Sequence, residues 1–349
     1  SRGLGDVYKR QALAFAMTAN TGFAQSSATG LKDAYKDYFS IGVAVNMQNI
    51  TNPEQIAIIK KDFNSITAEN DMKPQPTEPA YGQFNWENAD KIANFCRSNG
   101  IKLRGHCLMW HAQIGKWMYQ DEKGNLVSKE KLFQNMKHHI TAIMERYKDV
   151  VYAWDVVNEA ISDGGRPVMG QKPSPYRNSP LYQIAGDEFI KKAFIYAREA
   201  DPNVLLFYND YNAADPQKRD RIYNMVKSMK EEGVPIDGIG MQGHYNIYGP
   251  SMEDVDAALT KYSTIVKHIH ITELDIRANE EMGGHLNFSR EAGDISQTVK
   301  LLQEDQYTRL FKILRKHKDV VDNVTFWNLS DRDSWVGVRN YCLLYTSDA

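Results

Sequence analysis

Two glutamates in strand-like stretches are the residues of this sequence best suited to do chemistry. Glu159 lies near the end of "WDVVNEA" and Glu273 lies within "HITELDI", and both stretches are rich in the apolar and β-branched residues that form buried strands. A buried carboxylate is costly unless it is paired or used. Because the two are far apart in the chain, they belong to different strands and could face each other. Two opposed carboxyl groups can hydrolyse a glycosidic bond: one protonates the leaving oxygen, and the other attacks the anomeric carbon or activates water, depending on their separation.

Polar side chains also follow most of the other strand-like stretches. We expect strands within residues 39–45, 65–70, 101–110, 150–160, 204–212, 236–245, 267–276 and 323–331. The polar and aromatic residues at their carboxyl ends are Glu69, Asn70, Lys73, His106, Trp110, His111, Asn158, Asn209, Tyr211, Gln242, His244, Asp275 and Trp327. Barrel enzymes place their chemistry at the carboxyl ends of strands, so this ring of residues predicts a polar cleft on one face.

The segments between these strands predict helices. Residues 87–100, 130–147, 186–201, 216–233 and 304–319 repeat apolar residues at intervals of three and four, and Gly100 stands where a helix would be capped. About eight strands alternating with helices predict the α/β class and a TIM (β/α)8 barrel. We expect one catalytic domain over residues 25–341. His138 and His139 fall on one of the helical patterns, and we expect them to be solvated.

Composition excludes several classes of function. The chain has 349 residues, 42% hydrophobic and 25% charged, with a formal net charge of -2, which is ordinary for a globular protein and gives no support for nucleic-acid binding. No apolar run is long enough to span a bilayer, so no membrane anchor is expected. Cys96 and Cys107 are interpreted as small buried hydrophobes. The default expectation for oligomeric state is a monomer.

The two ends of the sequence look foreign to the rest. "DVYKRQ" and "CLLYTS" can be encoded by the two strands of one DNA tag, so we interpret residues 1–11 and 342–349 as derived from an adapter. Residues 12–24 form an apolar tract ending in small residues, which is typical of the tail of a secretory signal peptide. We therefore expect a secreted or periplasmic protein, and a barrel that lacks its last helix because the chain is truncated there.

Six motifs together resemble one known family. "ITAENDMK", "GHCLMWH", "WDVVNEA", "GMQGHY", "HITELDI" and "TFWNLSDRDSW" look like the motifs of family 10 glycoside hydrolases, the retaining endo-β-1,4-xylanases, and the resemblance covers about residues 32–341. It implies xylan or a xylo-oligosaccharide as substrate and no cofactor or metal. It also implies that Glu159 is the general acid/base and Glu273 the nucleophile. The substrate-binding residues that it implies are Glu69, Asn70, Lys73, His106, Trp110, Asn158, Tyr211, Gln242, His244, Trp327 and Trp335.

Strand periodicity explains the three polar residues of "HITELDI". Alternate residues of a strand share a face, so Glu273 and Asp275 can both face the mouth of the barrel, with His270 on the opposite parity. We expect His244 to bridge Glu273 and Asp275 and to keep Glu273 ionised. Neighbours that move the pKa values of two carboxyl groups apart would assign one as nucleophile and the other as acid.

Two departures from the family pattern concern the substrate. Asn328 stands after the tryptophan of the eighth strand, where the family often has glycine, and a side chain there could change a sugar contact. Residues 162–187 are rich in Gly, Pro and Ser, and we expect them to form a loop over the leaving-group side.

Three alternative functions remain open at this point. One is a retaining β-1,4-glucanase of similar barrel plan, and another is a barrel that binds polysaccharide without cleaving it. His268 and His270 form an HxH pair that could hold a metal ion in a metal-dependent barrel hydrolase. That third reading leaves Glu159 and Glu273 without a role.

Overall fold

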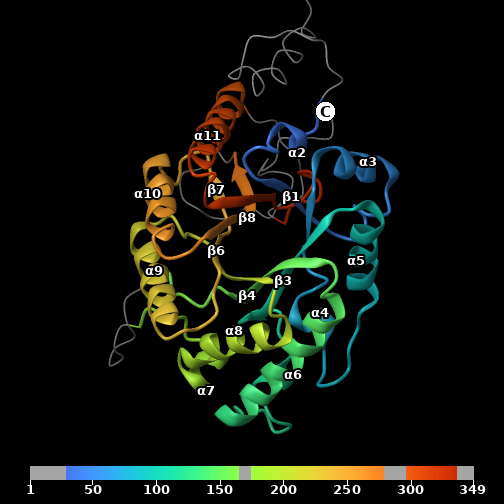
Figure 1. Ribbon diagram of the computed structural model, residues 1–349, viewed down its shortest axis with the longest axis vertical. Helices are drawn as coiled ribbons and strands as arrows, with labels where there is room; N and C mark the ends of the chain where they lie inside the picture. The colour runs from blue at the N-terminus through green and yellow to red at the C-terminus, as the bar shows by residue number, and fades with distance from the viewer. Residues whose placement is uncertain (1–28, 165–173, 279–295, 336–349) are drawn as a thin grey trace, which may run out of the picture.

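The computed structural model describes residues 29–164, 174–278 and 296–335, and within them parallel strands form a barrel surrounded by helices (Figure 1). The strands are β1 Ser40–Val45, β2 Ser65–Ala68, β3 Lys102–Trp110, β4 Val151–Asn158, β5 Leu205–Asp210, β6 Gly238–Met241, β7 His244–Asn246, β8 His268–Arg277 and β9 Val321–Phe326. The helices are α2 Leu31–Ala34, α3 Pro53–Asp62, α4 Pro74–Thr77, α5 Glu87–Asn99, α6 Lys129–Tyr147, α7 Pro180–Ala185, α8 Glu188–Ala200, α9 Pro216–Glu231, α10 Met252–Tyr262 and α11 Gln297–Lys316, with a 3-10 turn η1 at Lys116–Met118.

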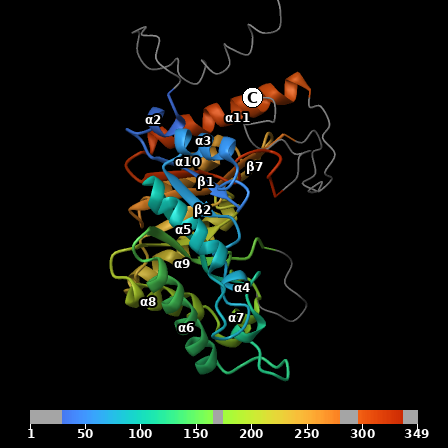
Figure 2. The same cartoon turned by 90° about the vertical axis from the view of Figure 1, so that its right-hand side faces the viewer.

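The barrel closes through parallel pairs only. Each of β1 to β5 pairs with the next strand along the chain, β6 pairs with β8, β8 pairs with β9, and β9 returns to β1. This is the predicted TIM barrel, which is confirmed over the described residues. Figures 1 and 2 show the helices on the outside of the strands, with α9 and α10 on one side and α3 and α5 on the other.

The sixth predicted strand is divided in two. Gly243 has a φ of 84°, a conformation that only glycine adopts freely, and it separates β6 from β7. The short strand β7 then pairs with the outer part of β8, which places His244 opposite Asp275. The break therefore turns His244 toward the residues that we expected it to contact.

Local sequence explains where several helices begin and end. Helix α3 begins with Pro53, and the Asn52 side chain accepts hydrogen bonds from the first turn. Asp215 caps α9 in the same way, ahead of Pro216. Helix α5 ends at Asn99 and is capped by Gly100, which has a φ of 64°, so the predicted glycine cap is confirmed.

A buried ion pair lies inside the barrel. Arg104 on β3 donates to both carboxylate oxygens of Asp155 on β4, at 2.5 Å each, and both side chains are 0% exposed. The Nε of Arg104 also donates to Nδ1 of His270 on β8, at 3.1 Å. Hydrogen-bonded partners are what allow charged groups to be buried in a barrel core at all.

The structure corrects two smaller expectations. His138 and His139 on α6 both contact the buried carboxylate of Glu78, and His139 is itself buried, so the expectation that both are solvated was wrong. The predicted loop over residues 162–187 contains the short helix α7, capped by Ser179. Cys96 and Cys107 are buried, as expected.

Several predictions fall outside the described residues. They are the adapter-derived segments 1–11 and 342–349, the signal segment 12–24 and the missing last helix, so these stay predictions. Within the ranges that the structure describes, none of the helices is both long and apolar enough to cross a bilayer.

Candidate active site

Glu273 is buried near the carboxyl end of β8, with a donor at each oxygen. Asn209 donates through Nδ2 to Oε1 at 2.8 Å, and His244 approaches Oε2 through Nε2 at 3.0 Å. Burial alone would raise the pKa of Glu273, but the hydrogen bond from His244 and the charge of His106 outweigh it and lower the pKa below its ordinary value. This carboxyl group is therefore held ionised.

His244 bridges two carboxylates, as expected from the sequence. Its Nδ1 lies 2.8 Å from Oδ2 of Asp275, while its Nε2 faces Glu273. Burial opposes the charged form of the ring, but Asp275 and Glu273 together raise the pKa of His244 to about 10. At neutral pH the ring is an imidazolium that donates from both nitrogens. Trp335 donates to the same oxygen of Asp275 through Nε1, at 2.9 Å.

Glu159 follows β4 directly and has neutral partners. Its Oε2 accepts a hydrogen bond from Nε1 of Trp110 at 2.9 Å, and its Oε1 accepts one from Nε2 of Gln242 at 3.0 Å. Its backbone has a φ of 57°, in the left-handed region. The main-chain N–H donates to the carbonyl of Asn209 at 2.9 Å, which ties this turn to β5.

A chain of side-chain amides joins the two glutamates. Gln242 donates to Oδ1 of Asn158 at 3.2 Å as well as to Glu159, and Asn209 donates to the same oxygen at 2.9 Å as well as to Glu273. The Oδ1 of Asn158 therefore accepts both amides. The two carboxyl groups belong to one hydrogen-bonded unit at the carboxyl ends of β4, β5, β6 and β8.

His106 is bonded to the ion pair in the barrel core, and its charge acts on Glu273. Its Nδ1 lies 2.8 Å from Oδ2 of Asp155, and its ring meets Trp327 edge to face at a centroid distance of 5.4 Å. Burial opposes ionisation of Asp155, but Arg104 and His106 lower its pKa to about 2. The carboxylate of Asp155 thus keeps His106 in place beside Glu273.

The residues expected on the glycone side form a second group. Lys73 is buried, donates to Oδ1 of Asn70 at 2.8 Å, and places its ammonium group 5.0 Å from the ring of Trp110. Glu69 lies on the same segment, and burial raises its pKa. Trp327 is buried beside His106, whereas Trp335 is 40% exposed. Asn328 has a φ of 95°, which explains why glycine suits this position in the family pattern.

Tyr211 contacts the described segments 160–164 and 174–177, through Asp163 and Arg177. Its hydroxyl accepts a hydrogen bond from Nη2 of Arg177 at 2.7 Å and contacts Asp163, and the ammonium group of Lys218 lies 3.4 Å from its ring centroid. Sequence reasoning did not assign a role to Arg177, which lies in a segment without periodicity. It placed Asn209 among the polar residues at the strand ends but assigned it no contact with Glu273.

A comparison of the chain with known protein families agrees with the six sequence motifs. The family model described as "Glycosyl hydrolase family 10" matches residues 30–349. This chain belongs to glycosyl hydrolase family 10. An endo-1,4-beta-xylanase/feruloyl esterase of Xylanibacter ruminicola is 61% identical over 324 residues, which are 91% of this chain and 45% of that protein. An endo-1,4-beta-xylanase B of Paenibacillus barcinonensis is 38% identical and is covered over 88% of both chains.

Solved structures of the family have the same fold. A psychrophilic family 10 endo-beta-1,4-xylanase is 68% identical, with a TM-score of 0.86 over 92% of this chain and 95% of that one. A xylanase XynB from Paenibacillus barcinonensis, complexed with a conduramine derivative, is 36% identical with a TM-score of 0.84 over 93% and 96% of the two chains. The chain spans less than half the length of the first curated relative, 45% of it, and 29% of the Thermotoga neapolitana endo-1,4-beta-xylanase A.

Both histidines of the HxH pair in this family 10 chain contact other side chains of the protein. His270 accepts a hydrogen bond from Arg104, and burial together with that positive charge lowers the pKa of His270 well below its ordinary value. His268 contacts Asp322 at the amino end of β8. No cluster of three or more metal-ligating side chains occurs among residues 29–164, 174–278 and 296–335.

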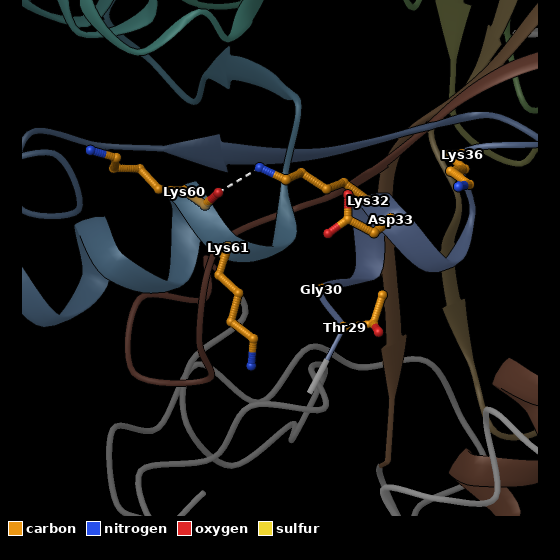
Figure 3. Close-up of a pocket in the computed structure, with 7 residues that line it drawn as sticks. All are labelled: Thr29, Gly30, Lys32, Asp33, Lys36, Lys60 and Lys61. Atoms are coloured by element: carbon orange, nitrogen blue, oxygen red, sulfur yellow. Dashed lines mark hydrogen bonds between the residues drawn. The ribbon is translucent and has the colours of Figure 1, made fainter. Parts of the chain in front are cut away.

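A lysine-rich pocket lies away from this site (Figure 3). Its lining residues are Thr29, Gly30, Lys32, Asp33, Lys36, Lys60 and Lys61. Lys32 donates to the carbonyl of Lys60 at 2.6 Å. These residues precede β1 and β2, so the pocket is at the amino end of the barrel, opposite the carboxyl ends that carry both glutamates.

Proposed function

We propose that this chain is a retaining endo-β-1,4-xylanase that hydrolyses internal linkages of xylan. The observation that carries the proposal is the asymmetric pair of carboxyl groups. Glu273 is held ionised by the His244 imidazolium, while the oxygens of Glu159 have neutral donors. One charged nucleophile and one proton donor are what the double-displacement mechanism requires.

The mechanism has two steps that use the same two residues. In the first, Glu273 attacks the anomeric carbon, the glycosidic bond breaks, and Glu159 gives its proton to the leaving oxygen. In the second, Glu159 takes a proton from water, the water oxygen bonds to the anomeric carbon, and the bond to Glu273 breaks. Glu159 regains its proton, and the anomeric configuration is retained.

The surrounding residues fit recognition of a pyranose polymer. Asn158 accepts two amide donors through its oxygen, which leaves its own amide for the hydroxyl beside the reacting carbon. Lys73, Asn70 and Glu69 offer polar contacts to the glycone sugars, and Trp335 offers an apolar ring face. Relatives that are named xylanases support xylan over the glucan alternative.

Export is part of the same proposal. Residues 12–24 have the composition of a signal-peptide tail, and a polymeric substrate is met outside the cytoplasm. We therefore propose that the enzyme acts as a secreted or periplasmic protein.

The test measures the rate at which reducing ends are released from xylan by the unaltered protein and by the variant Glu273→Gln. The matched control is Glu122→Gln, in an exposed loop. We expect the Glu273 variant to lose at least about 10³-fold in kcat, since the nucleophile forms the covalent intermediate, while the control keeps its rate. A faster initial rate on a cello-oligosaccharide than on xylan would favour the glucanase instead. Binding of xylan without turnover would favour the non-catalytic barrel, and inactivation by a chelator would favour the metal-dependent hydrolase.

A further inference from the structure

The backbone of Glu159 needs support from its surroundings. With a φ of 57° it lies in the left-handed region, which residues with a side chain adopt only when neighbouring groups hold them there. Two hydrogen bonds do so. The N–H donates to the carbonyl of Asn209 on β5, and the carbonyl accepts a hydrogen bond from Nε of Arg177 at 2.9 Å. The second of these comes from a side chain outside the barrel strands.

Arg177 is itself held from several directions. Its main-chain N–H donates to the carbonyl of Ala160 at 2.8 Å, next to the antiparallel bridge between Ile161 and Tyr176. Its Nη2 donates to the hydroxyl of Tyr211 at 2.7 Å. The guanidinium group therefore touches the turn that carries the acid/base and a ring on the leaving-group side. A planar group with fixed donors suits such a double contact better than a flexible ammonium group would.

Lys218 and Asp163 also hold Tyr211 in place. Lys218 on α9 is 1% exposed; it pairs with Asp163 at 2.7 Å and with Asp210 at 2.9 Å, and it packs over the ring of Tyr211. Asp163 also contacts the hydroxyl of Tyr211. The aromatic ring that Arg177 touches is thus fixed by a buried ion pair.

We propose that Arg177 is a positioning residue for the acid/base, fixing the main chain of Glu159 and linking it through Tyr211 to the leaving-group side. The inference rests on the function proposed above. Its consequence is that proton transfer to the leaving oxygen depends on Arg177, whereas attack by Glu273 does not. The alternative is that Arg177 only tethers residues 174–179 to the barrel.

The charges around Glu159 are consistent with this role. Burial and the charge of Arg177 lower the pKa of His111, so this neighbouring ring is neutral. The charge of Lys218 is shared by Asp163 and Asp210, and Glu273 is matched by His244. Burial opposes the charged form of Arg177, but its hydrogen bond to Tyr211 and the neighbouring charges, that of Glu159 among them, raise the pKa of the guanidinium, so Arg177 remains a cation close to Glu159.

The test compares two substrates that differ in their need for an acid. Cleavage of xylohexaose requires protonation of the leaving sugar oxygen, whereas a 2,4-dinitrophenyl β-xylobioside releases a stable phenolate without it. The variants are Arg177→Met, which removes charge and donors, and Arg177→Lys, which keeps the charge. Asn178→Ala, at an exposed neighbour in the same segment, is the matched control. Thermal melts of all four proteins establish that each is folded.

For Arg177→Met we expect kcat on xylohexaose to fall by about 10- to 100-fold with little change in KM, a part of the effect typical of general acid catalysis. We expect kcat/KM on the dinitrophenyl substrate to stay within about 3-fold of the unaltered protein, because its first step needs no proton. Arg177→Lys should recover part of the lost rate, and Asn178→Ala should match the unaltered protein.

Three results would overturn the inference. They are an equal loss on both substrates, a rise in KM alone, or a Met variant that behaves like the unaltered protein. The first would mean general damage to the site, the second a role in binding the leaving group only, and the third a tether only. If the unaltered protein cleaves neither substrate, the proposed function fails instead, and that failure is visible without any variant.

Discussion

Replacing His244 by glutamine tests how the nucleophile is kept charged. The glutamine amide can still donate a hydrogen bond, but it carries no charge, so Glu273 and Asp275 would be two buried carboxylates around a neutral group. The cost of ionising both then rises. We expect the acid limb of kcat/KM to move to higher pH by about 1 to 3 units, the usual effect of a close opposite charge on a carboxyl group.

The structure also sets the scale of the effect on stability. One pKa unit corresponds to about 1.36 kcal/mol, so the rise of the His244 pKa from 6.5 to about 10 represents on the order of 4 to 5 kcal/mol of preference for the imidazolium. Because the folded-state pKa is raised, this contribution is fully present below about pH 6.5 and is lost as the pH rises through about 10. The variant should therefore be less stable than the unaltered protein at neutral pH, by a few kcal/mol, and the difference should shrink as the pH rises toward about 10 and be largely gone above it.

Two measurements check these expectations. The first is kcat/KM on a dinitrophenyl β-xylobioside from about pH 4 to about pH 8, since this substrate isolates attack by the nucleophile from acid catalysis. The second is urea unfolding at neutral and at alkaline pH. His268→Gln, at the amino end of β8, the strand that carries Glu273, is the matched control and should leave the acid limb in place. An acid limb that does not move in His244→Gln would show that the imidazolium does not keep Glu273 ionised.

Two further substitutions test the barrel beneath the site. Arg104→Met leaves Asp155 buried without its two strongest donors and should lower the free energy of unfolding by about 3 to 5 kcal/mol in urea. Because the pKa of Asp155 is lowered to about 2, its ionised form stabilises the fold fully above its ordinary pKa of 3.8. The loss of unfolding free energy in the variant should therefore become smaller as the pH falls toward about 2. A loss that does not depend on pH would contradict this. Gly105→Ala would put a Cβ 2.2 Å from the ring of Trp154 and should cost about 1 to 3 kcal/mol, so an unchanged thermal melt would show that this contact is not rigid.

The sequence was enough to predict the barrel and the contacts of Glu273. β-branched runs alternating with amphipathic segments predict a parallel sheet wrapped by helices, and every predicted strand is present. The period of two along β8 was sufficient to place Glu273 and Asp275 on one face. His244 comes from the preceding predicted strand, and the pairing of β7 with β8 brings it opposite Asp275.

The missed features depend on information that periodicity does not contain. The break at Gly243 is a matter of one backbone angle, which an unbroken strand pattern over residues 236–245 does not reveal. Arg177 reaches Glu159 from an aperiodic segment, and its partner there is a carbonyl, which every residue has. His139 is different, because it lies three residues after Met136 and four before Ile143, on the apolar face of α6; that spacing was a usable sign of burial.

The way the two glutamates are connected explains how one site can hold two identical side chains in opposite roles. A cation shared by both would favour ionisation of both and leave no acid. Here the link between them is made of neutral amides, from Gln242 through Asn158 to Asn209, and amides bind either form of a carboxyl group. Among the residues that the structure describes, the imidazolium in direct contact with a catalytic carboxyl group is His244, on the Glu273 side. Each glutamate accepts two hydrogen bonds, but only the donors of Glu273 include a cation. This difference allows Glu159 to lose and regain a proton while Glu273 stays ionised and able to attack.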